Sequence, residues 1–160
     1  YPSTPDLQSL NTLHKEFPGI KSFQDEMDDF ARKHRYVTSI AGRKMNLDAM
    51  YDHDSEHRGL RQASNFVIQA SATDIAKASM IAIDADSTGR GYKARIINQI
   101  HDEILLEIHK SQLKEVVDMI LDRMSNTITI SVPLKVGVEA ALDWGSVRDI
   151  TEVYKELGIV

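Results

Sequence analysis

The stretch at residues 94–108 reads ARIINQIHDEILLEI and places an acidic pair directly after a histidine, between two apolar runs. Short runs that are rich in β-branched and bulky apolar residues are typical of β-strands. The sequence therefore predicts a hairpin of strands 94–100 and 104–108 that are joined at His101 and Asp102. A strand scaffold holds a side chain rigidly, which suits a metal-binding carboxylate. An ordinary turn explains the aspartate about equally well, because Asp tolerates turn geometry.

The composition bounds the class of protein. The chain has 160 residues, of which 42% are hydrophobic, a usual size for one domain with enough apolar residues to form a core. It has no cysteine, which rules out a disulfide framework and a thiolate zinc site. We find no uninterrupted apolar run of membrane-spanning length and no secretory signal at the first residues. We therefore expect an intracellular, cytoplasmic protein without a membrane partner.

The charge is unevenly distributed along the chain. A net charge of −5 argues against a dedicated nucleic-acid binder, whose phosphate contacts usually make the domain basic. Residues 32–61 nevertheless hold seven Lys or Arg against four Asp or Glu, whereas residues 103–160 hold six against ten. A basic arm on an acidic body is compatible with a nucleic-acid partner that touches part of the surface. Ordinary solvated helix faces explain the same charges.

The apolar spacing and the turn residues predict an α+β fold. We expect N-terminal helices and a long central helix packed on a small antiparallel sheet that contains the hairpin. The elements expected before the hairpin are helices at 7–17 and 20–33, an extended stretch at 36–46, a polar loop at 48–57, a long helix at 58–85 and a turn at 87–91. Those expected after it are a helix at 110–126, a strand at 132–140 and a short helix at 147–157.

Three forked hydrogen-bond donors share one face of the long helix. Arg61, Asn65 and Gln69 are spaced i, i+4 and i+8, and none of them carries negative charge. The minor groove of DNA offers a hydrogen-bond acceptor on every base, so such a face can check the shape of a base pair without reading sequence. An exposed polar helix face explains the stripe without a ligand. Asp74 falls in the opposite, apolar arc, where we expect it to be semi-buried and to need a hydrogen-bond partner.

Four segments in register resemble family A, the DNA polymerase I-like polymerases. Residues 61–77 read RQASNFVIQASATDIAK and are similar to R-x-A-x-N-x-x-x-Q-G-T-A-A-D-x-x-K. Residues 99–104, QIHDEI, are similar to motif C of the family, Q-V-H-D-E-L. Residues 132–138 with Asp143 and Trp144 resemble the closing V-P-L-x-V-x-V-x-x-G-x-x-W, and residues 36–44 resemble G-Y-V-x-T-x-x-G-R-R. Order and spacing agree across essentially all 160 residues.

The sequence departs from the family pattern at a few positions. Ala70 replaces the usual Gly, Thr73 replaces an Ala, and Leu60 stands where a Glu usually precedes the Arg. These departures concern local packing, and they leave the assignment of the four segments unchanged.

The resemblance implies a role for each residue at the hairpin tip. Asp102 would be one of two carboxylates that hold a pair of catalytic Mg²⁺ ions, with Glu103 assisting the metal site. His101 would contact the primer terminus. The reaction implied is template-directed DNA synthesis, in replication or repair, by nucleotidyl transfer onto a primer 3′-hydroxyl. Primer–template DNA and deoxynucleoside triphosphates would be the partners, and the gene could belong to a bacterium or a phage.

The resemblance also implies a set of DNA contacts. Arg61, Asn65 and Gln69 would face the minor groove and the template near the nascent base pair. Arg43 and Lys44 would contact the duplex backbone.

Two segments of the family pattern are not found in residues 1–160. These are the D-Y-S-x-I-E segment with the first metal-binding carboxylate and the fingers helix R-x-x-x-K-x-x-x-F-x-x-x-Y-G, which grips the incoming triphosphate. We therefore expect a C-terminal fragment of a polymerase domain, with residues 1–57 as a helical, basic arm and residues 58–160 as a palm portion. Mg²⁺ would be held only in part, and the chain alone would be inactive. An engineered piece, a domain fragment and one half of a split polymerase remain open, the last requiring a partner chain.

Two other classes of function compete with a polymerase. A non-catalytic DNA-binding or structural module derived from a polymerase would keep the polar stripe while the metal site drifted. A metallohydrolase would use Asp52, His53, Asp54 and His57, because the two histidines are spaced i, i+4. That segment is polar, lacks a helix cap and lacks the Glu of H-E-x-x-H, so a solvated loop explains it better.

Overall fold

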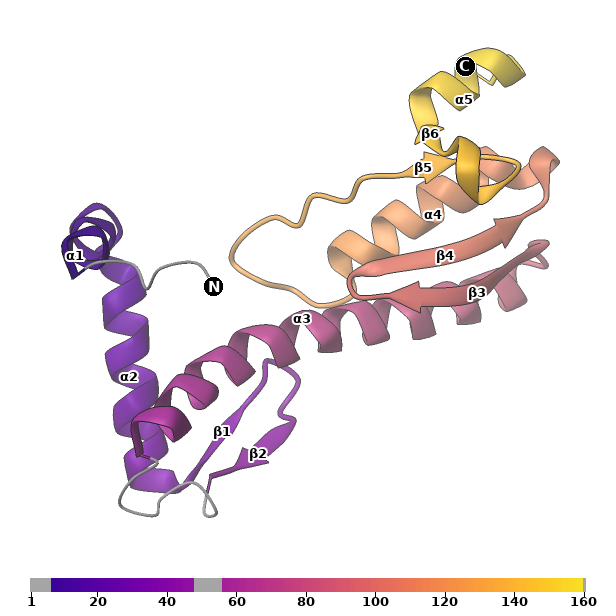
Figure 1. Ribbon diagram of the computed structural model, residues 1–160. Coiled ribbons are helices and arrows are strands. Elements are labelled where there is room, and N and C mark those ends of the chain that lie inside the picture. Colours follow the sequence, from indigo (N-terminus) through magenta and orange to yellow (C-terminus); the bar gives the residue numbers. More distant parts are fainter. Residues whose placement is uncertain (1–6, 48–55, 160) are drawn as a thin grey trace. The chain divides into compact units, whose positions relative to one another are not determined.

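The computed structural model describes residues 7–47 and 56–159 (Figure 1). Its contacts divide the chain into two compact units, Tyr1–Asp74 and Ile75–Val160. The division falls inside one long helix, α3 (Glu56–Gly89), which contributes residues to both units. Each unit has a hydrophobic core of its own.

The first unit begins with two helices, α1 (Leu7–Glu16) and α2 (Pro18–His34), which confirm the two predicted from apolar spacing. Pro18 opens α2 at its first turn, where the missing N–H of proline removes no helical hydrogen bond. The helix ends at Arg35, which takes a left-handed conformation with φ +60° and donates its N–H to the carbonyl of Ala31.

A short hairpin follows, made of β1 (Tyr36–Thr38) and β2 (Lys44–Asn46), and it confirms the extended stretch predicted there. The strands are antiparallel, with Val37 opposite Met45. Gly42 lies in the connecting turn at φ +81°, a conformation that glycine adopts without steric cost.

The core of the first unit joins α2, this hairpin and the first half of α3. Its buried members are Ala31, Val37, Leu47, Leu60 and Ala63. Ala31 of α2 and Ala63 of α3 have no exposed surface in this core. Partly buried side chains complete the cluster: Phe30, Met45, Phe66 and Val67.

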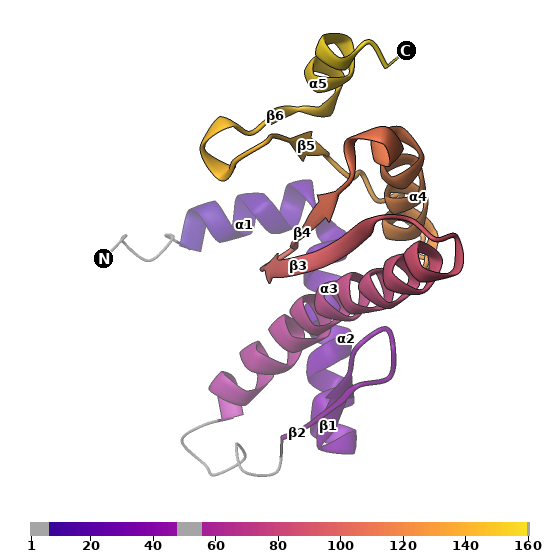
Figure 2. The same ribbon diagram turned by 90° about the vertical axis from the view of Figure 1, so that its right-hand side faces the viewer.

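The second unit contains the predicted hairpin, β3 (Ala94–Ile100) and β4 (Glu103–Ile108), beside the second half of α3 (Figure 2). The turn η2 (Lys110–Gln112) leads into α4 (Leu113–Asn126). The chain closes with β5 (Glu139–Ala140), η3 (Trp144–Ser146), β6 (Arg148–Asp149) and α5 (Ile150–Leu157).

Two helices and the hairpin form the main core of the second unit. Ile83 of α3 and Val116, Met119 and Ile120 of α4 are buried there. The hairpin covers them with one face, which presents Ala94, Ile96, Ile104, Leu106 and Ile108. A smaller cluster packs α5 on α4 through Val117, Ile150 and Val153. The hairpin therefore rests on a packed helical layer.

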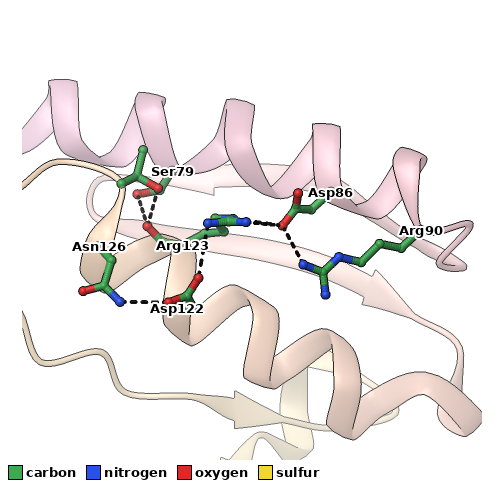
Figure 3. Close-up of polar contacts among 7 residues, drawn as sticks. Ser79, Asp86, Arg90, Asp122, Arg123 and Asn126 are labelled. Atoms are coloured by element: carbon green, nitrogen blue, oxygen red, sulfur yellow. Dashed lines mark hydrogen bonds and ion pairs between the residues drawn. The ribbon is translucent and has the colours of Figure 1, made fainter.

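Polar contacts also join α3 to α4 (Figure 3). The guanidinium of Arg123 lies 2.9 Å from the carboxylate of Asp86, which Arg90 approaches at 3.5 Å. Beside them, the Ser79 hydroxyl donates to the Arg123 carbonyl at 3.4 Å. The hydrogen bond to Asp86 and the negative charge of that carboxylate raise the pKa of Arg123.

The end of α3 differs from the prediction of a turn at 87–91, because the helix continues to Gly89. The N–H of Tyr92 donates to the carbonyl of Ser87, and the N–H of Gly91 donates to that of Thr88. These are the two bonds of a Schellman motif, and Gly91 supplies the left-handed residue that it needs, at φ +66°. The second of the two glycines therefore ends the helix.

The predicted strand at 132–140 is wrong over most of its length. Only Glu139 and Ala140 pair, and their partners are Asp149 and Arg148. Pro133 lacks an N–H, and a segment becomes a strand only where another strand offers a free edge. The short helix predicted at 147–157 begins at Ile150, after the Asp149 side chain caps it.

The predicted fold class, helices with small antiparallel sheets, is confirmed. The sheet is less continuous than expected, however: the described residues form three separate two-stranded pairs. One pair, β1–β2, precedes the long helix. The helix also starts earlier than predicted, at Glu56, so the last two residues of the predicted polar loop are helical. Residues 48–55 of that loop lie outside the described part of the chain.

Candidate metal and nucleic-acid site

The hairpin tip places three polar side chains next to one another. Ile100 pairs with Glu103, so His101 and Asp102 form a two-residue turn. His101 has φ +54°, in the left-handed region, where His, Asn and Asp occur more often than other non-glycine residues. The Gln99 side-chain amide donates to the His101 carbonyl at 3.2 Å and braces the turn. The sequence thus predicted the position of the tip correctly.

Strand β3 contains a β-bulge between Ile96 and Asn98, shortly before the hairpin tip. Ile96 pairs with Leu106, but Asn98 pairs with Leu105, which leaves Ile97 unpaired. A bulge shifts the alternation of side chains by one residue and bends the strand. The side chains after the bulge therefore alternate between the two faces of the hairpin in the opposite phase to those at the start of the strand. The sequence carried a signal that our prediction missed, because two adjacent isoleucines break the alternation.

The three side chains at the tip are exposed, which leaves both carboxylates accessible to solvent. Carboxylate oxygens are the ligands that Mg²⁺ prefers, and two neighbouring ones can supply part of its coordination shell. Within the described residues, no group of three or more His, Asp or Glu side chains is arranged to hold a metal ion. The donors at Asp102 and Glu103 thus fit magnesium chemically, but they provide only part of a site.

The polar stripe on α3 is exposed as its spacing predicted. Arg61, Asn65 and Gln69 are solvent-exposed, whereas Ala63 and Ala70 on the opposite arc are buried. The stripe belongs to the first unit, and the hairpin tip belongs to the second. The helix therefore presents a neutral-to-basic donor surface to solvent, and its role in DNA binding stays a prediction.

Asp74, which lies in the apolar arc of α3, forms an ion pair with Arg43. Its side chain is only 10% exposed, and one carboxylate oxygen lies 2.7 Å from the guanidinium of Arg43. The same guanidinium nitrogen donates to the Ala70 carbonyl at 2.8 Å. The Ser71 hydroxyl accepts a hydrogen bond at 2.9 Å from the backbone N–H of Ile40. These contacts bind the β1–β2 turn to α3.

The two residues expected at the duplex backbone both have local contacts. Arg43 holds Asp74, a role that the sequence did not reveal although both residues belong to segments that resemble the family pattern. Lys44 is exposed and places its ammonium nitrogen 3.7 Å from the centre of the Tyr36 ring, a cation–π contact. Neither contact occupies the whole side chain, since 41% of the Arg43 side chain remains exposed.

The alternative zinc site cannot be placed. Asp52, His53 and Asp54 lie outside the described residues, and so does the side chain of His57.

Helix α3 is long and apolar enough to be a candidate membrane span. Within Arg58–Gly89 an 18-residue window reaches a mean hydropathy of 1.3, so by length and composition this helix could cross a bilayer. Our search for long apolar runs missed it because charged residues interrupt the run. A core helix of a soluble protein passes the same test. In the structure 22% of that window is buried, and α3 contributes Leu60, Ala63 and Ile83 to the two cores.

Comparison with known proteins gives a consistent match. The sequence model of the family described as DNA polymerase family A matches residues 7–146. The chain is 36% identical over 137 residues to DNA polymerase I of Streptococcus pneumoniae serotype 4, covering 84% of this chain and 16% of that protein. It is 33% identical over 131 residues to DNA polymerase I of Treponema pallidum, covering 81% and 13%.

A solved structure agrees with these sequence matches. The POL domain of Pol1 from M. smegmatis, solved in complex with DNA primer-template and dNTP, matches this fold with a TM-score of 0.76 and 29% identity. The match covers 79% of this chain and 23% of that one. The chain therefore spans less than a quarter of the proteins that it resembles.

Proposed function

This chain belongs to DNA polymerase family A, and on that premise we propose that it forms part of a template-directed DNA polymerase. In the proposed reaction the primer 3′-hydroxyl oxygen attacks the α-phosphorus of a deoxynucleoside triphosphate. The bond to the β-phosphate oxygen breaks, and pyrophosphate leaves. The observation that carries the proposal is the exposed hairpin tip, which presents Asp102 and Glu103 side by side within the matched residues 7–146.

The hairpin tip contributes the acidic part of the catalytic centre. Asp102 would hold Mg²⁺, and Glu103 would assist from the first residue of β4. Mg²⁺ held there supplies positive charge to the reacting phosphates. His101 precedes the aspartate in a left-handed turn, and we assign to it a contact with the primer terminus. The bulge at Ile97 and the brace from Gln99 hold the direction of the tip.

The α3 stripe contributes the DNA contacts. Arg61, Asn65 and Gln69 would donate to the minor-groove acceptors near the nascent pair. Support comes from their exposure on the face opposite the buried alanines. Lys44 and the exposed part of Arg43 would reach the duplex backbone, with Arg43 serving mainly to hold the β1–β2 turn on α3.

We also propose that residues 1–160 do not polymerise DNA by themselves. The sequence contains one acidic metal-binding segment of the family pattern and no Lys-bearing fingers segment. Activity would then need a polypeptide that carries the missing motifs, in an intracellular compartment that holds DNA. In this scheme residues 1–57 act as a helical arm, in which five of the seven Lys and Arg residues lie at positions 32–44, and residues 58–160 act as the palm portion of one C-terminal fragment.

The test is reconstitution. The chain is mixed with the polymerase domain of the pneumococcal relative from which the matching stretch has been deleted, together with primed template, Mg²⁺ and nucleotides. We expect primer extension in the mixture, none in either part, and a loss of at least about 100-fold when Asp102→Asn is used. Glu107→Gln is the matched control, because it changes an exposed carboxylate of the same hairpin, on β4 and away from the tip. Extension that survives Asp102→Asn would contradict the assignment.

A non-catalytic DNA-binding module is the second candidate. The incomplete metal site among the described residues favours it. Such a module binds duplex DNA equally well as Asp102→Asn and as wild type, and it never supports extension in the mixture. Binding without extension would therefore decide for the module.

A further inference from the structure

The end of α2 and the β1–β2 hairpin form a basic segment in an acidic chain. Residues 30–47 read FARKHRYVTSIAGRKMNL and contain five Lys or Arg but no Asp or Glu, whereas the whole chain has a net charge of −5. In the fold the last turn of α2 lies beside β1 (Figure 1). The cations of this segment are therefore gathered on neighbouring elements of the first unit.

Two of the five cations are engaged by carboxylates, and two others are not. Arg32 lies 3.0 Å from Glu56, and Arg43 is held by the ion pair described above. Lys33 and Lys44 are exposed, and no carboxylate among the described residues forms an ion pair with either of them. Their positive charge is therefore available to a ligand that carries phosphate groups.

Three aromatic rings lie together beside these lysines. The ring centre of Phe30 is 4.3 Å from that of His34 and 5.7 Å from that of Tyr36. Phe30 also packs against the core of the first unit, which fixes the cluster to the fold. His34 is exposed, so part of its ring is open to solvent. We call Phe30, Lys33, His34, Tyr36 and Lys44 the aromatic–basic patch.

Rings and cations together suit an unpaired strand. The bases of a single strand can stack on an aromatic side chain while its phosphates meet cations. Because the ammonium group of Lys44 lies over the Tyr36 ring, His34 is the ring of the patch that remains for a base. Cations in the last turn of a helix also complement the helix dipole, but that effect needs no exposed ring.

We propose that the aromatic–basic patch binds single-stranded nucleic acid, with a base stacked on His34 and a neighbouring phosphate held by Lys33. The site goes beyond the proposed function, because neither the hairpin tip nor the α3 stripe contributes to it. It rests on the proposed function only for the class of its ligand. Every base has a face that can stack, so the patch should bind without sequence preference.

The first experiment measures the contribution of the His34 ring. The 160-residue chain is titrated against a labelled strand of about ten thymidines, and binding is followed by fluorescence anisotropy. We expect His34→Ala to raise Kd at least about fivefold, whereas His34→Phe, which keeps a ring, should stay within about twofold of the wild type. His109→Ala is the matched control, because it removes an exposed histidine of the second unit, and its Kd should equal the wild-type value.

A strand of the same length without bases separates stacking from charge. His34→Ala should leave the Kd for this abasic strand unchanged. Lys33→Ala should weaken the binding of both strands and reduce the slope of log K against log salt by about 0.7, because one phosphate contact to a single strand is lost. Lys15→Ala on α1 is the control for charge, and circular dichroism checks that each variant retains its helix content.

Four outcomes would overturn the proposal. One is a wild-type chain that does not bind the thymidine strand, and another is an equal loss for His34→Ala and His109→Ala. A third is a loss for His34→Ala that is as large with the abasic strand, since His34 would then act only on the fold. A fourth is an equal loss for His34→Ala with a blunt duplex, since the patch would then have no preference for unpaired bases.

Failure of the patch is distinguishable from failure of the proposed function. The binding assay contains no Mg²⁺, no nucleotides and no second polypeptide, so it does not depend on the hairpin tip. Normal single-strand binding by His34→Ala, together with primer extension by the reconstituted mixture, removes the patch and leaves the polymerase role. Binding that depends on His34 without any primer extension supports the patch and removes the polymerase role.

Discussion

The guanidinium of Arg43 lies 2.7 Å from the carboxylate of Asp74 and ties the β1–β2 hairpin to helix α3. The second oxygen of Asp74 is buried without a hydrogen-bond partner among the described residues. The carboxylate therefore depends on one cation for its stability in the fold. The same cation comes from the segment that resembles the family's G-R-R pattern, so a motif expected to touch DNA also holds the fold together.

Arg43→Met should lower the free energy of unfolding by about 2 kcal/mol, because it leaves a mostly buried carboxylate unpaired. Urea unfolding followed by circular dichroism measures the loss. The double variant Arg43→Met/Asp74→Leu should recover part of it, since removing both partners leaves no orphaned charge. A double variant less stable than the single one would contradict this account of the pair.

Replacing the stripe should weaken duplex binding without changing sequence preference. Arg61→Ala should also reduce the slope of log K against log salt by up to about one, because a cation that would lie in the minor groove between two phosphate backbones is lost. Anisotropy titrations of several duplexes at a series of salt concentrations measure both quantities. Lys15→Ala on α1 is the control, since it removes an exposed cation outside the stripe. Equal effects of the two substitutions would show that Arg61 acts only through its positive charge and makes no specific contact with DNA.

His101→Gly should keep the fold of the hairpin tip and remove the imidazole. Glycine accepts the left-handed φ of this position at no steric cost but raises the entropy of the unfolded chain, so the net change in stability should stay within about 1 kcal/mol. Primer extension in the reconstituted mixture should nevertheless fall, because the imidazole is lost. His101→Asn, which also tolerates this backbone, should behave in the same way. Wild-type extension by both variants would show that the imidazole has no role.

The cap of α5 predicts a pH dependence. The Asp149 carboxylate accepts hydrogen bonds from the Thr151 hydroxyl and from the Thr151 N–H, and these two bonds hold the pKa of Asp149 below its usual range. A carboxylate whose pKa is lower in the folded state stabilises the helix above its unfolded-state pKa. That stabilisation is lost as pH falls through the lowered value.

Amide exchange of α5 measures this loss of the cap. We expect protection at Val153 to fall between about pH 5 and pH 2, whereas Asp149→Asn, a neutral cap, should show little change over that range. Identical pH profiles for the two proteins would assign the acid sensitivity to another carboxylate.

Much of the fold could be predicted from local pattern. Helix α2 follows its apolar stripe, and the β3–β4 hairpin follows two apolar runs around a His-Asp turn. The exposed face of α3 was predicted from spacing alone, because a helix repeats every 3.6 residues whatever it packs against. The candidate site residues were found through the family pattern, and their exposure agrees with the surface roles proposed for them.

The misses share a physical cause. Residues 132–138 have strand-like composition, but a strand needs a partner edge, and that depends on which segments come together in space. The same holds for the cation of Arg43, whose partner Asp74 is distant in the sequence.

The sequence by itself determined what depends on near neighbours: the helical periods and the two-residue turn at His101 and Asp102. Only the tertiary structure decided which polar groups became partners, as Arg43 and Asp74 did, and which strand pairs with β5. Backbone periodicity and turn geometry are local properties of the chain. Pairing and burial depend on distances between segments that no local pattern encodes.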